Sequence, residues 1–324
     1  MRFTFLGTSA GLPTKERNVT ALALAPEQQR EWYLIDCGEG TQHRLLHTQY
    51  SAAKLRAIFI THIHGDHCYG LPGLIASAQM SGRKNPLTIC APAGIHEYID
   101  AVRRYTDLAN IGYELNFVRS DEPNFYFDDG AVHVDSIALS HRVPSYAYRF
   151  VERVSERLLD PEKLAALDVP RGVLWGELQN GHSVQLANGR HITPEQVCHP
   201  PRVPRCIVVG GDNDQPDLLI PALRDCDVLI HEATFTEDVL TRVGPSYQHS
   251  TPAQVAKAAQ AAQLPHLLLT HFSQRYRRTR IASEHSIDDL FAEAKKYYTG
   301  NLLLASDLAS YELTRDKQLL STTR

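Results

Sequence analysis

The stretch THIHGDHCYG, residues 61–70, places three histidines and an aspartate within six positions. It follows the apolar run 57–60, which predicts a buried β-strand. A turn at the end of such a strand lies at the carboxyl edge of a sheet, where α/β folds place ligand sites. His62 and His64 can converge on one metal, while Asp66 and His67 turn toward a neighbouring one. Imidazole and carboxylate suit zinc, manganese or ferrous iron, so the stretch predicts a metal site.

The composition is that of a globular protein with a sizeable core, since 43% of the 324 residues are hydrophobic and 22% are charged. No run approaches the roughly 18–20 apolar residues of a membrane helix. The opening MRFTFLGTSAG lacks the apolar region of a secretory signal. The six cysteines show neither a CxxC pair nor a disulfide-like spacing, which suits a reducing compartment. We therefore expect a cytoplasmic protein that does not enter a membrane.

The net charge of −4 argues against a generally basic, nucleic-acid-binding surface. A polyanionic substrate would have to be held by metal or by local basic clusters. Two such clusters occur, at residues 15–17 and, more densely, at residues 275–280. On charge alone, each is more typical of a solvated loop.

Predicted strands and helices alternate, but several strands form hairpin-like pairs, which favours a sandwich of two mixed sheets with outer helices. Residues 151 to about 203 differ, because they are charged, carry several prolines and have no long strand. They predict a protruding arm or a small helical insertion.

We expect strands at 2–6, 20–25, 32–35, 57–60, 87–90, 132–138, 146–150, 206–209, 228–230 and 267–269, and helices at 42–48, 95–105 and 251–262.

The stretch THIHGDH resembles motif II of the metallo-β-lactamase superfamily. The whole chain is similar to the short form of the ribonuclease Z (tRNA 3′-processing endonuclease) family. The resemblance implies an αββα sandwich of two mixed β-sheets, formed by one domain, residues 1–324, with an inserted substrate-binding arm at about 151–203. The matching segments run almost from end to end in order: FLGTSAGLPTKERN, LIDCGEGTQHR, FITHIHGDHCYGLPGL, LSHRVPSYAYRF, GGDND, LIHEATF, QHST and LLLTHFSQRY.

The resemblance implies two zinc ions per chain, although manganese, iron or cobalt also suit such ligands. Three of the implied ligands lie later in the chain and follow apolar runs, as ligands at strand ends should: His141, Asp212 and His271. Taken singly, each would be interpreted as a turn or cap residue. The first ion would be bound by His62, His64 and His141, the second by Asp66, His67 and His271, and Asp212 would bridge both.

The same resemblance assigns catalytic roles. Two metals can activate water and stabilise charge on the phosphate, and Asp66 would orient that water and accept its proton. His249, in the HST motif, would donate a proton to the leaving 3′-oxygen, and Glu232, in HEATF, would orient His249. Alternatively, Glu232 anchors a ligand and His249 caps a helix. Asp36 is equally consistent with a partner of a ligand histidine and with a turn residue.

The segment PTKERN matches a family loop that the resemblance connects with positioning the tRNA 3′ end. Lys15 and Arg17 could contact phosphates there, and Asn18 completes the motif. The resemblance also implies a homodimer in which the arm of one subunit serves the site of the other. Cys37 and Cys68 lie near the site but do not match ligand positions, so we expect core thiols.

Two departures bear on the substrate. Asn213-Asp214 replaces the family's Thr-Arg after the bridging aspartate, and the arm reads PRGV at 170–173 where a Gly-Pro pair is common. The arm has one lysine, Lys163, so tRNA recognition is expected to weaken or to use other contacts.

The favoured function is zinc-dependent endonucleolytic cleavage on the 3′ side of tRNA precursors. The alternative is a phosphodiesterase for small or cyclic nucleotides, or for general RNA 3′ ends. A thioester or lactam hydrolase is disfavoured by the PTKERN loop and the long arm. A non-catalytic, zinc-stabilised RNA-binding protein is disfavoured because the implied ligand set is that of an open site.

Overall fold

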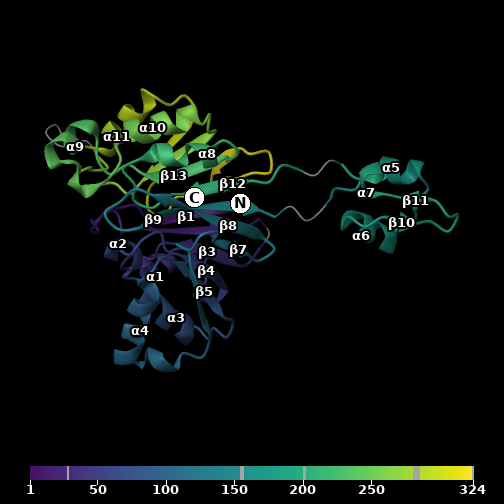
Figure 1. Cartoon of the computed structure of the whole chain (residues 1–324), viewed down its shortest axis with the longest axis horizontal. Coiled ribbons are helices and arrows are strands. Elements are labelled where there is room, and N and C mark those ends of the chain that lie inside the picture. The colour runs from purple at the N-terminus through teal and green to yellow at the C-terminus, as the bar shows by residue number, and fades with distance from the viewer. Residues whose placement is uncertain (28, 154–156, 200–201, 280–284, 323–324) are drawn as a thin grey trace.

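The computed structural model describes residues 1–27, 29–153, 157–199, 202–279 and 285–322. In these residues two β-sheets pack face to face, and helices cover the outer face of each (Figure 1). Both sheets mix parallel and antiparallel pairs. The predicted αββα sandwich is confirmed.

The first sheet, as far as the chain is described, has eight strands in the order β17-β16-β1-β2-β3-β4-β5-β6. Its outer face is covered mainly by α1 (Thr41–Leu45), α3 (Leu71–Met80) and α4 (Ile95–Tyr105), and α2 (Gly65–Cys68) follows β4. The strands are β1 (Arg2–Gly7), β2 (Ala21–Ala25), β3 (Trp32–Ile35), β4 (Leu55–Phe59), β5 (Leu87–Ala91), β6 (Leu115–Arg119), β16 (Ser310–Leu313) and β17 (Leu319–Ser321).

The second sheet has seven strands within the described ranges, in the order β15-β14-β13-β12-β9-β8-β7. Its outer face carries α8 (Ile220–Leu223), α9 (Glu237–Val243), α10 (Pro252–Ala261) and α11 (Ile287–Lys295). The strands are β7 (Tyr126–Asp128), β8 (Val132–Leu139), β9 (Ser145–Glu152), β12 (Cys206–Val209), β13 (Val228–Glu232), β14 (His266–Thr270) and β15 (Asn301–Leu304). Short 3₁₀ turns lie at Ala52–Lys54, Asp107–Asn110, Pro216–Leu219 and Pro245–Tyr247.

The apolar run at residues 57–60 is buried on both faces of the first sheet. Phe59 points between the sheets, where its ring centroid lies 5.0 Å from that of Phe150 and 5.3 Å from that of Tyr148. Ile58 and Ile60 point the other way, under the helices. A strand buried on both faces reads as a continuous apolar run, which explains why residues 57–60 carry no polar side chain.

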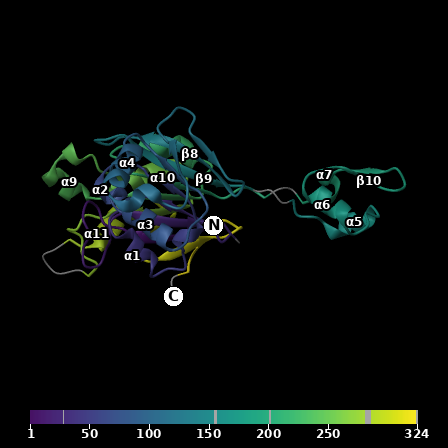
Figure 2. The ribbon, with the colours of Figure 1, turned by 90° about the horizontal axis from the view of Figure 1, so that it is seen from below.

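The arm between β9 and β12 contains α5 (Pro161–Ala166), α6 (Val173–Gln179), β10 (Val184–Gln185), β11 (His191–Ile192) and α7 (Pro194–Val197). It stands away from the sandwich in two perpendicular views (Figures 1 and 2). Buried apolar side chains form a separate small core there, including Leu164, Leu178, Ile192 and Val197. The insertion is therefore both helical and protruding. Residues 154–156 and 200–201, within the predicted arm, lie outside the described residues.

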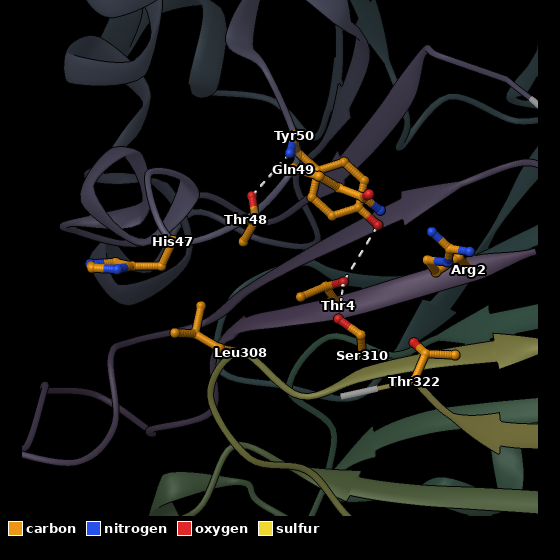
Figure 3. A pocket seen from close by; sticks show the side chains of 9 residues that line it. All are labelled: Arg2, Thr4, His47, Thr48, Gln49, Tyr50, Leu308, Ser310 and Thr322. Atoms are coloured by element: carbon orange, nitrogen blue, oxygen red, sulfur yellow. Dashed lines mark hydrogen bonds between the residues drawn. The ribbon is translucent and has the colours of Figure 1, made fainter. Parts of the chain in front are cut away.

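A polar hollow of about 560 Å³ lies on the first sheet beside the pairing of β1 with β16 (Figure 3). Thr4 Oγ1 lies 2.8 Å from Ser310 Oγ and 3.4 Å from the Tyr50 hydroxyl, so hydroxyl contacts link the two strands to the loop after α1. The hollow is a feature of the sheet surface, lined by residues other than those of the predicted metal site.

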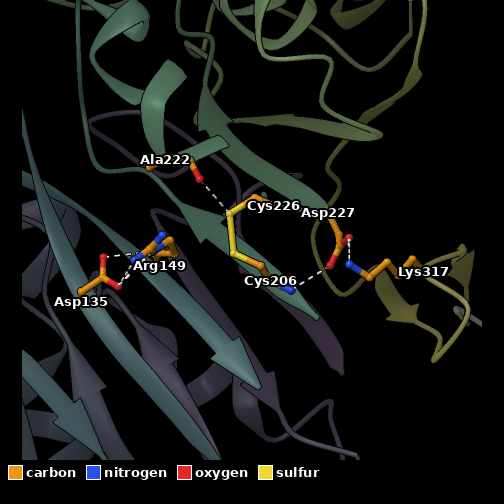
Figure 4. The surroundings of a disulfide bond; sticks show 7 residues. All are labelled: Asp135, Arg149, Cys206, Ala222, Cys226, Asp227 and Lys317. Atoms are coloured by element: carbon orange, nitrogen blue, oxygen red, sulfur yellow. Dashed lines mark hydrogen bonds and ion pairs between the residues drawn. A yellow bond between two sulfur atoms is a disulfide. The ribbon is translucent and has the colours of Figure 1, made fainter. Parts of the chain in front are cut away.

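Cys206 and Cys226 are joined by a disulfide, which the cysteine spacing does not predict (Figure 4). The backbone N–H of Cys206 donates to Asp227 at 2.8 Å, and Asp227 pairs with Lys317 at 2.9 Å. These contacts connect the starts of β12 and β13 at the end of the sheet nearest the arm. The expectation for Cys37 and Cys68 is confirmed, because both are buried free thiols.

Candidate metal centre and catalytic cleft

Strand ends from both sheets bring the predicted site residues to one edge of the sandwich. β4 belongs to the first sheet, and the other contributing strands belong to the second, so the site lies where the two sheets meet. His62 and His64 follow β4, His141 follows β8, Asp212 follows β12, Glu232 ends β13 and His271 follows β14.

Four of the predicted residues form a first group. His64 Nδ1 lies 3.1 Å from His62 Nε2 and 3.2 Å from His141 Nε2. Asp212 Oδ2 lies 3.6 Å from His62 Nε2 and 3.7 Å from His141 Nε2. The four ligand-type atoms therefore face one another around a single point.

Asp66, His67 and His271 form a second group. The Nε2 atoms of His67 and His271 are 3.3 Å apart, and they lie 3.5 Å and 3.4 Å from Asp66 Oδ2. The other oxygen of Asp212, Oδ1, lies 3.5 Å from His67 Nε2 and 3.4 Å from His271 Nε2. Asp212 thus turns one carboxylate oxygen toward each group.

The residues present fit a pair of metal ions. Ligand atoms about 2.0–2.1 Å from a tetrahedral ion would lie about 3.3 Å from one another, close to the separations within each group. Asp212 Oδ1 is buried and has no hydrogen-bond partner among the described residues. A buried carboxylate oxygen without a partner is costly, and a cation shared by His67, His271 and Asp212 would remove that cost.

Hydrogen bonds to the outer ring nitrogens turn four histidines toward the site. His67 Nδ1 lies 2.7 Å from Asp36 Oδ2, and His141 Nδ1 lies 2.9 Å from the Gln248 carbonyl. The Nδ1 atoms of His62 and His271 lie 3.0 Å from the hydroxyls of Thr61 and Thr234. An Nδ1–H that donates outward leaves the lone pair of Nε2 pointing inward. His64 differs, since its Nδ1 faces the group.

Asp36, directly after β3, is held in place by Thr61. Asp36 accepts hydrogen bonds from the backbone N–H of Thr61 at 2.8 Å and from its hydroxyl, besides facing His67. Its φ is 57°, in the left-handed region that non-glycine residues seldom adopt. His271 has the same φ of 57°. Unusual backbone at these two positions concentrates strain at the site, and the Asp36–His67 contact favours a ligand-orienting role over an ordinary turn.

Glu232 and His249 form a buried pair beside Asp212. Glu232 Oε1 accepts from the Ser250 N–H at 2.7 Å and lies 3.3 Å from His249 Nδ1. His249 Nδ1 also lies 3.8 Å from Asp212 Oδ2. Burial would lower the pKa of His249, but the carboxylates of Glu232 and Asp212 outweigh burial and raise that pKa to about 9. The two carboxylates therefore favour the protonated form of the imidazole.

The start of α10 fixes the position of His249. Thr251 Oγ1 accepts from the Gln254 N–H at 3.2 Å, and the Gln254 side chain accepts from the Thr251 N–H at 2.8 Å. This capping box, with Pro252 in the first turn, sets where residues 249–251 leave the helix.

Asp66 is held at the mouth of the site. Its Oδ2 accepts a hydrogen bond of 2.7 Å from the Gly11 N–H and faces His67 and His271. Burial would raise the pKa of Asp66, but the two imidazoles outweigh it and hold the pKa below its ordinary value. The carboxylate is ionised at neutral pH.

A ribonuclease Z from Marinobacter nauticus is 54% identical to this chain over 319 residues, which are 98% of each protein. A ribonuclease Z from Pseudomonas putida is 48% identical over 316 residues, which are 98% of this chain and 97% of the relative. The chain belongs to the ribonuclease Z family.

Solved structures agree with this membership. The short form of human tRNase Z superposes with a TM-score of 0.64 at 26% identity, covering 96% of this chain and 99% of the human one. The metallo-β-lactamase fold protein YhfI from Bacillus subtilis also gives a TM-score of 0.64, and at 19% identity it shows the fold alone. A family model described as anti-Pycsar protein Apyc1 matches residues 1–99, the part that contains the THIHGDH stretch.

The ribonuclease Z loop PTKERN is attached to the sandwich by Arg17. This side chain is buried, and its guanidinium donates to the carbonyls of Tyr276 at 2.9 Å and Ser273 at 3.1 Å. Two guanidinium nitrogens of Arg17 therefore hold the backbone, and a phosphate contact by Arg17 stays a prediction. Lys15 is exposed, and Asn18 donates to the Glu39 carbonyl at 2.9 Å.

The family departure at 213–214 does not place an acid in the cleft. Asn213 is buried, and its Oδ1 accepts from the Ser140 N–H at 3.2 Å, which supports the loop that carries His141. Asp214 lines a separate hollow of about 460 Å³ with Asp217 and Lys257. The departure therefore removes the arginine of the family pattern but adds no acid to the cleft.

Sequence reasoning missed several contributors. Thr61, Thr234 and the Gln248 carbonyl orient ligands, and only Thr61, next to His62, has a position that suggests such a role. In the basic cluster, Arg275 lies over the Phe235 ring at 5.8 Å, while Arg280 lies outside the described residues. None of the helices in the described ranges is long and apolar enough to span a membrane.

Proposed function

We propose that this protein removes 3′ trailers from tRNA precursors by hydrolysing one phosphodiester bond on the 3′ side of the tRNA. The observation that carries the proposal is the shared carboxylate of Asp212 between two ligand groups, with the Glu232–His249 pair beside it. Two adjacent cationic centres with a proton donor at one side suit a phosphodiester, in which charge develops on several oxygens. Family membership supplies the substrate, since the relatives are ribonuclease Z proteins.

We assign three roles to the side chains of this chain. Asp66, ionised and open to the cleft, orients the attacking water and accepts its proton. His249 donates a proton to the departing 3′-oxygen, and Glu232 keeps the imidazole oriented and charged.

The ligand groups are proposed to hold two zinc ions. The first group is His62, His64 and His141, the second is Asp66, His67 and His271, and Asp212 bridges them. When bound, the ions would activate water and neutralise charge on the phosphate oxygens. Manganese, iron or cobalt would suit the same nitrogen and oxygen ligands.

The direction of the arm supports a homodimer. The arm departs after Glu152 at one end of β9, whereas Ser145, at the other end, lies beside the site. Eight residues of strand at ~3.3 Å each separate the two ends by about 25 Å. An arm that leaves from the far end and points away would serve the site of a partner subunit.

An exposed apolar surface supports self-association as well. Leu46 borders a hollow of about 560 Å³ with Ser81, and Leu46 and Met80, which precedes Ser81 in the chain, are 80% and 88% exposed. Large exposed apolar side chains are typical of interfaces. A cytoplasmic location is proposed as well, because tRNA precursors are found inside cells.

The test is a cleavage assay with mapped ends on a 3′-extended tRNA precursor and, separately, a small phosphodiester. Cutting just past the acceptor stem that is lost after chelation, and lost in Asp66→Ala, would support the proposal. Turnover of the small diester with the precursor intact would instead favour the alternative, a phosphodiesterase for small or cyclic nucleotides. Activity that survives exhaustive chelation would exclude both.

A further inference from the structure

The catalytic cleft contains two exposed side chains to which the proposed chemistry gives no role. The cleft has a volume of about 420 Å³, and its walls hold residues from both sheets. Tyr69 and Arg142 line it together with the ligands and with Leu12 and Pro13. Neither side chain belongs to a ligand group or to the Glu232–His249 pair.

The ring of Tyr69 is held against the backbone of Gly65. A Cβ added at Gly65 would lie 2.1 Å from the Tyr69 ring, so only glycine lets the ring lie there. The Tyr98 ring approaches with its centroid 6.4 Å away. Tyr69 nevertheless remains 63% exposed. An aromatic ring that is fixed on one side and open to a nuclease cleft on the other is suited to stacking on a base.

Arg142 is the one arginine or lysine among the described residues that line the cleft, where the acidic residues are Glu39, Asp66 and Asp212. It directly follows His141, and its guanidinium carbon lies 5.9 Å from the Tyr247 ring centroid. Within the described ranges no carboxylate pairs with it. A guanidinium matches the paired oxygens of a phosphate and keeps its charge at any working pH.

The two side chains approach the site from different sheets. Tyr69 follows α2, after β4 of the first sheet, and Arg142 follows β8 of the second. We propose that Tyr69 and Arg142 form a two-point grip on the nucleotides flanking the scissile bond, in which Tyr69 stacks on a base and Arg142 holds a flanking phosphate. This inference rests on the proposed function, and it adds residues that select single-stranded RNA over small diesters.

The test compares protein variants on chemically altered substrates. The RNA is a 3′-extended precursor in three forms: unmodified, abasic at the nucleotides flanking the cut, and carrying neutral methylphosphonates at the flanking linkages. Methyl p-nitrophenyl phosphate serves as the small diester. Tyr105→Ala and Arg104→Ala are the matched controls, because both residues are exposed at the end of α4 and line no part of the cleft.

We expect Tyr69→Ala to lower kcat/KM on the unmodified RNA by about tenfold, and Tyr69→Phe to stay near wild type. On the abasic RNA, Tyr69→Ala should cause no further loss. Arg142→Ala should lower kcat/KM by about 10- to 100-fold, with partial recovery in Arg142→Lys and no loss on the methylphosphonate RNA. Both alanine variants should keep wild-type metal content, melting temperature and turnover of the small diester.

The grip is overturned if the losses persist on the altered RNAs, or match those of Tyr105→Ala and Arg104→Ala. An equal loss on the small diester by Arg142→Ala would also overturn it, since Arg142 would then act on the scissile phosphate. A single-stranded oligonucleotide with the same modifications separates this inference from the proposed function. If wild type cuts the oligonucleotide and spares the precursor, tRNA processing fails while the same comparison still decides the grip. If wild type cuts neither RNA, both fail.

Discussion

The two ends of the paired strands β9 and β12 are held by different kinds of contact. At the metal end, backbone bonds fix the geometry: the Gly211 N–H donates to the Tyr146 carbonyl at 3.2 Å, and the Tyr146 N–H donates to the Thr61 carbonyl at 3.1 Å. At the arm end, Glu152 accepts from Arg202 at 2.6 Å and from Arg205, whose side chain is fully buried. Backbone bonds therefore connect the two sheets at the metal end, whereas at the arm end a buried charge cluster adds to the backbone bond from Glu152 to Arg205.

The largest expected effect of a substitution lies at the metal end. Asp212→Ala removes the only carboxylate that turns an oxygen toward each ligand group in the described chain. Activity should fall on the order of 10³-fold or more on the precursor and the small diester alike, and metal analysis should show less than wild-type loading. Asp214→Ala is the matched control, since Asp214 lines a separate hollow. Equal metal content in the two variants would contradict the bridging role.

His249→Ala should come next, with a loss of about 10²- to 10³-fold on the precursor. Metal content should remain at the wild-type level, because the proposed zinc ligands do not include His249, which lies in a third cluster of ligand-type atoms with Asp212 and His271. A small diester with a p-nitrophenolate leaving group needs little protonation, so its turnover should fall much less. Equal losses on both substrates would show that His249 does not act as the acid.

Glu152→Gln tests the arm end. Removing one charge from a buried cluster should lower the free energy of unfolding by about 3 kcal/mol, measured by urea denaturation. Burial would raise the pKa of Glu152, but Arg205 and Arg202 outweigh burial and lower that pKa to about 2 from an ordinary 4.5. Its contribution is therefore present above pH 4.5 and is lost as the pH falls from 4.5 toward 2.

The acid dependence provides a control for that prediction. Wild type should lose stability through this window, and Glu152→Gln should lose less. Glu195→Gln, which removes an exposed pair with Arg157 on the arm, should change stability by less than about 0.5 kcal/mol. If Glu195→Gln lowered the free energy of unfolding as much as Glu152→Gln, the buried cluster would not be what stabilises the arm end.

The smallest effects separate Lys15 from Arg17. Arg17→Ala leaves two buried carbonyls without their donors and should cost about 1–3 kcal/mol of stability. Lys15→Ala should leave stability unchanged and reduce the salt dependence of RNA binding by about one phosphate contact. A larger salt effect in Arg17→Ala than in Lys15→Ala would restore the phosphate contact that the sequence predicts for Arg17.

At the metal end, the sequence predicts the candidate ligands better than the residues that orient them. The candidate ligands lie in short motifs directly after apolar strands. THIHGDH alone predicts a metal site, whereas the family resemblance was needed to name His141, Asp212 and His271. The orienting partners were harder to find, because Thr234 and Gln248 act through contacts across the fold that no local pattern marks. The burial of Arg17 is likewise not visible in the sequence, because a charged residue in a loop looks exposed until its tertiary partners are known.

The arm end was predicted only in outline. Charge and proline content distinguish 151–203 from the rest of the chain. They do not predict the ion pairs of Glu152 with Arg202 and Arg205, because about fifty positions separate the glutamate from the arginines and no motif marks any of the three. Likewise, Cys206 and Cys226 have no spacing that signals a pair, and they meet because parallel strands β12 and β13 start side by side.

The pairing of β9 with β12, where the arm begins and ends, has a consequence for how the chain folds. Cys206 pairs with Val151 across the sheet, so β9 and β12 can join only after the long segment between them is looped back. Closing a flexible loop of that length costs about 3–4 kcal/mol of entropy. Within the arm, however, Leu159 bridges to Cys198, and the Asp160 N–H donates to the Val197 carbonyl at 2.8 Å. Early formation of these contacts would shorten the loop between β9 and β12. The pairing of the two strands would then resemble the closing of a hairpin, and it would be faster than pairing across the full length of the arm.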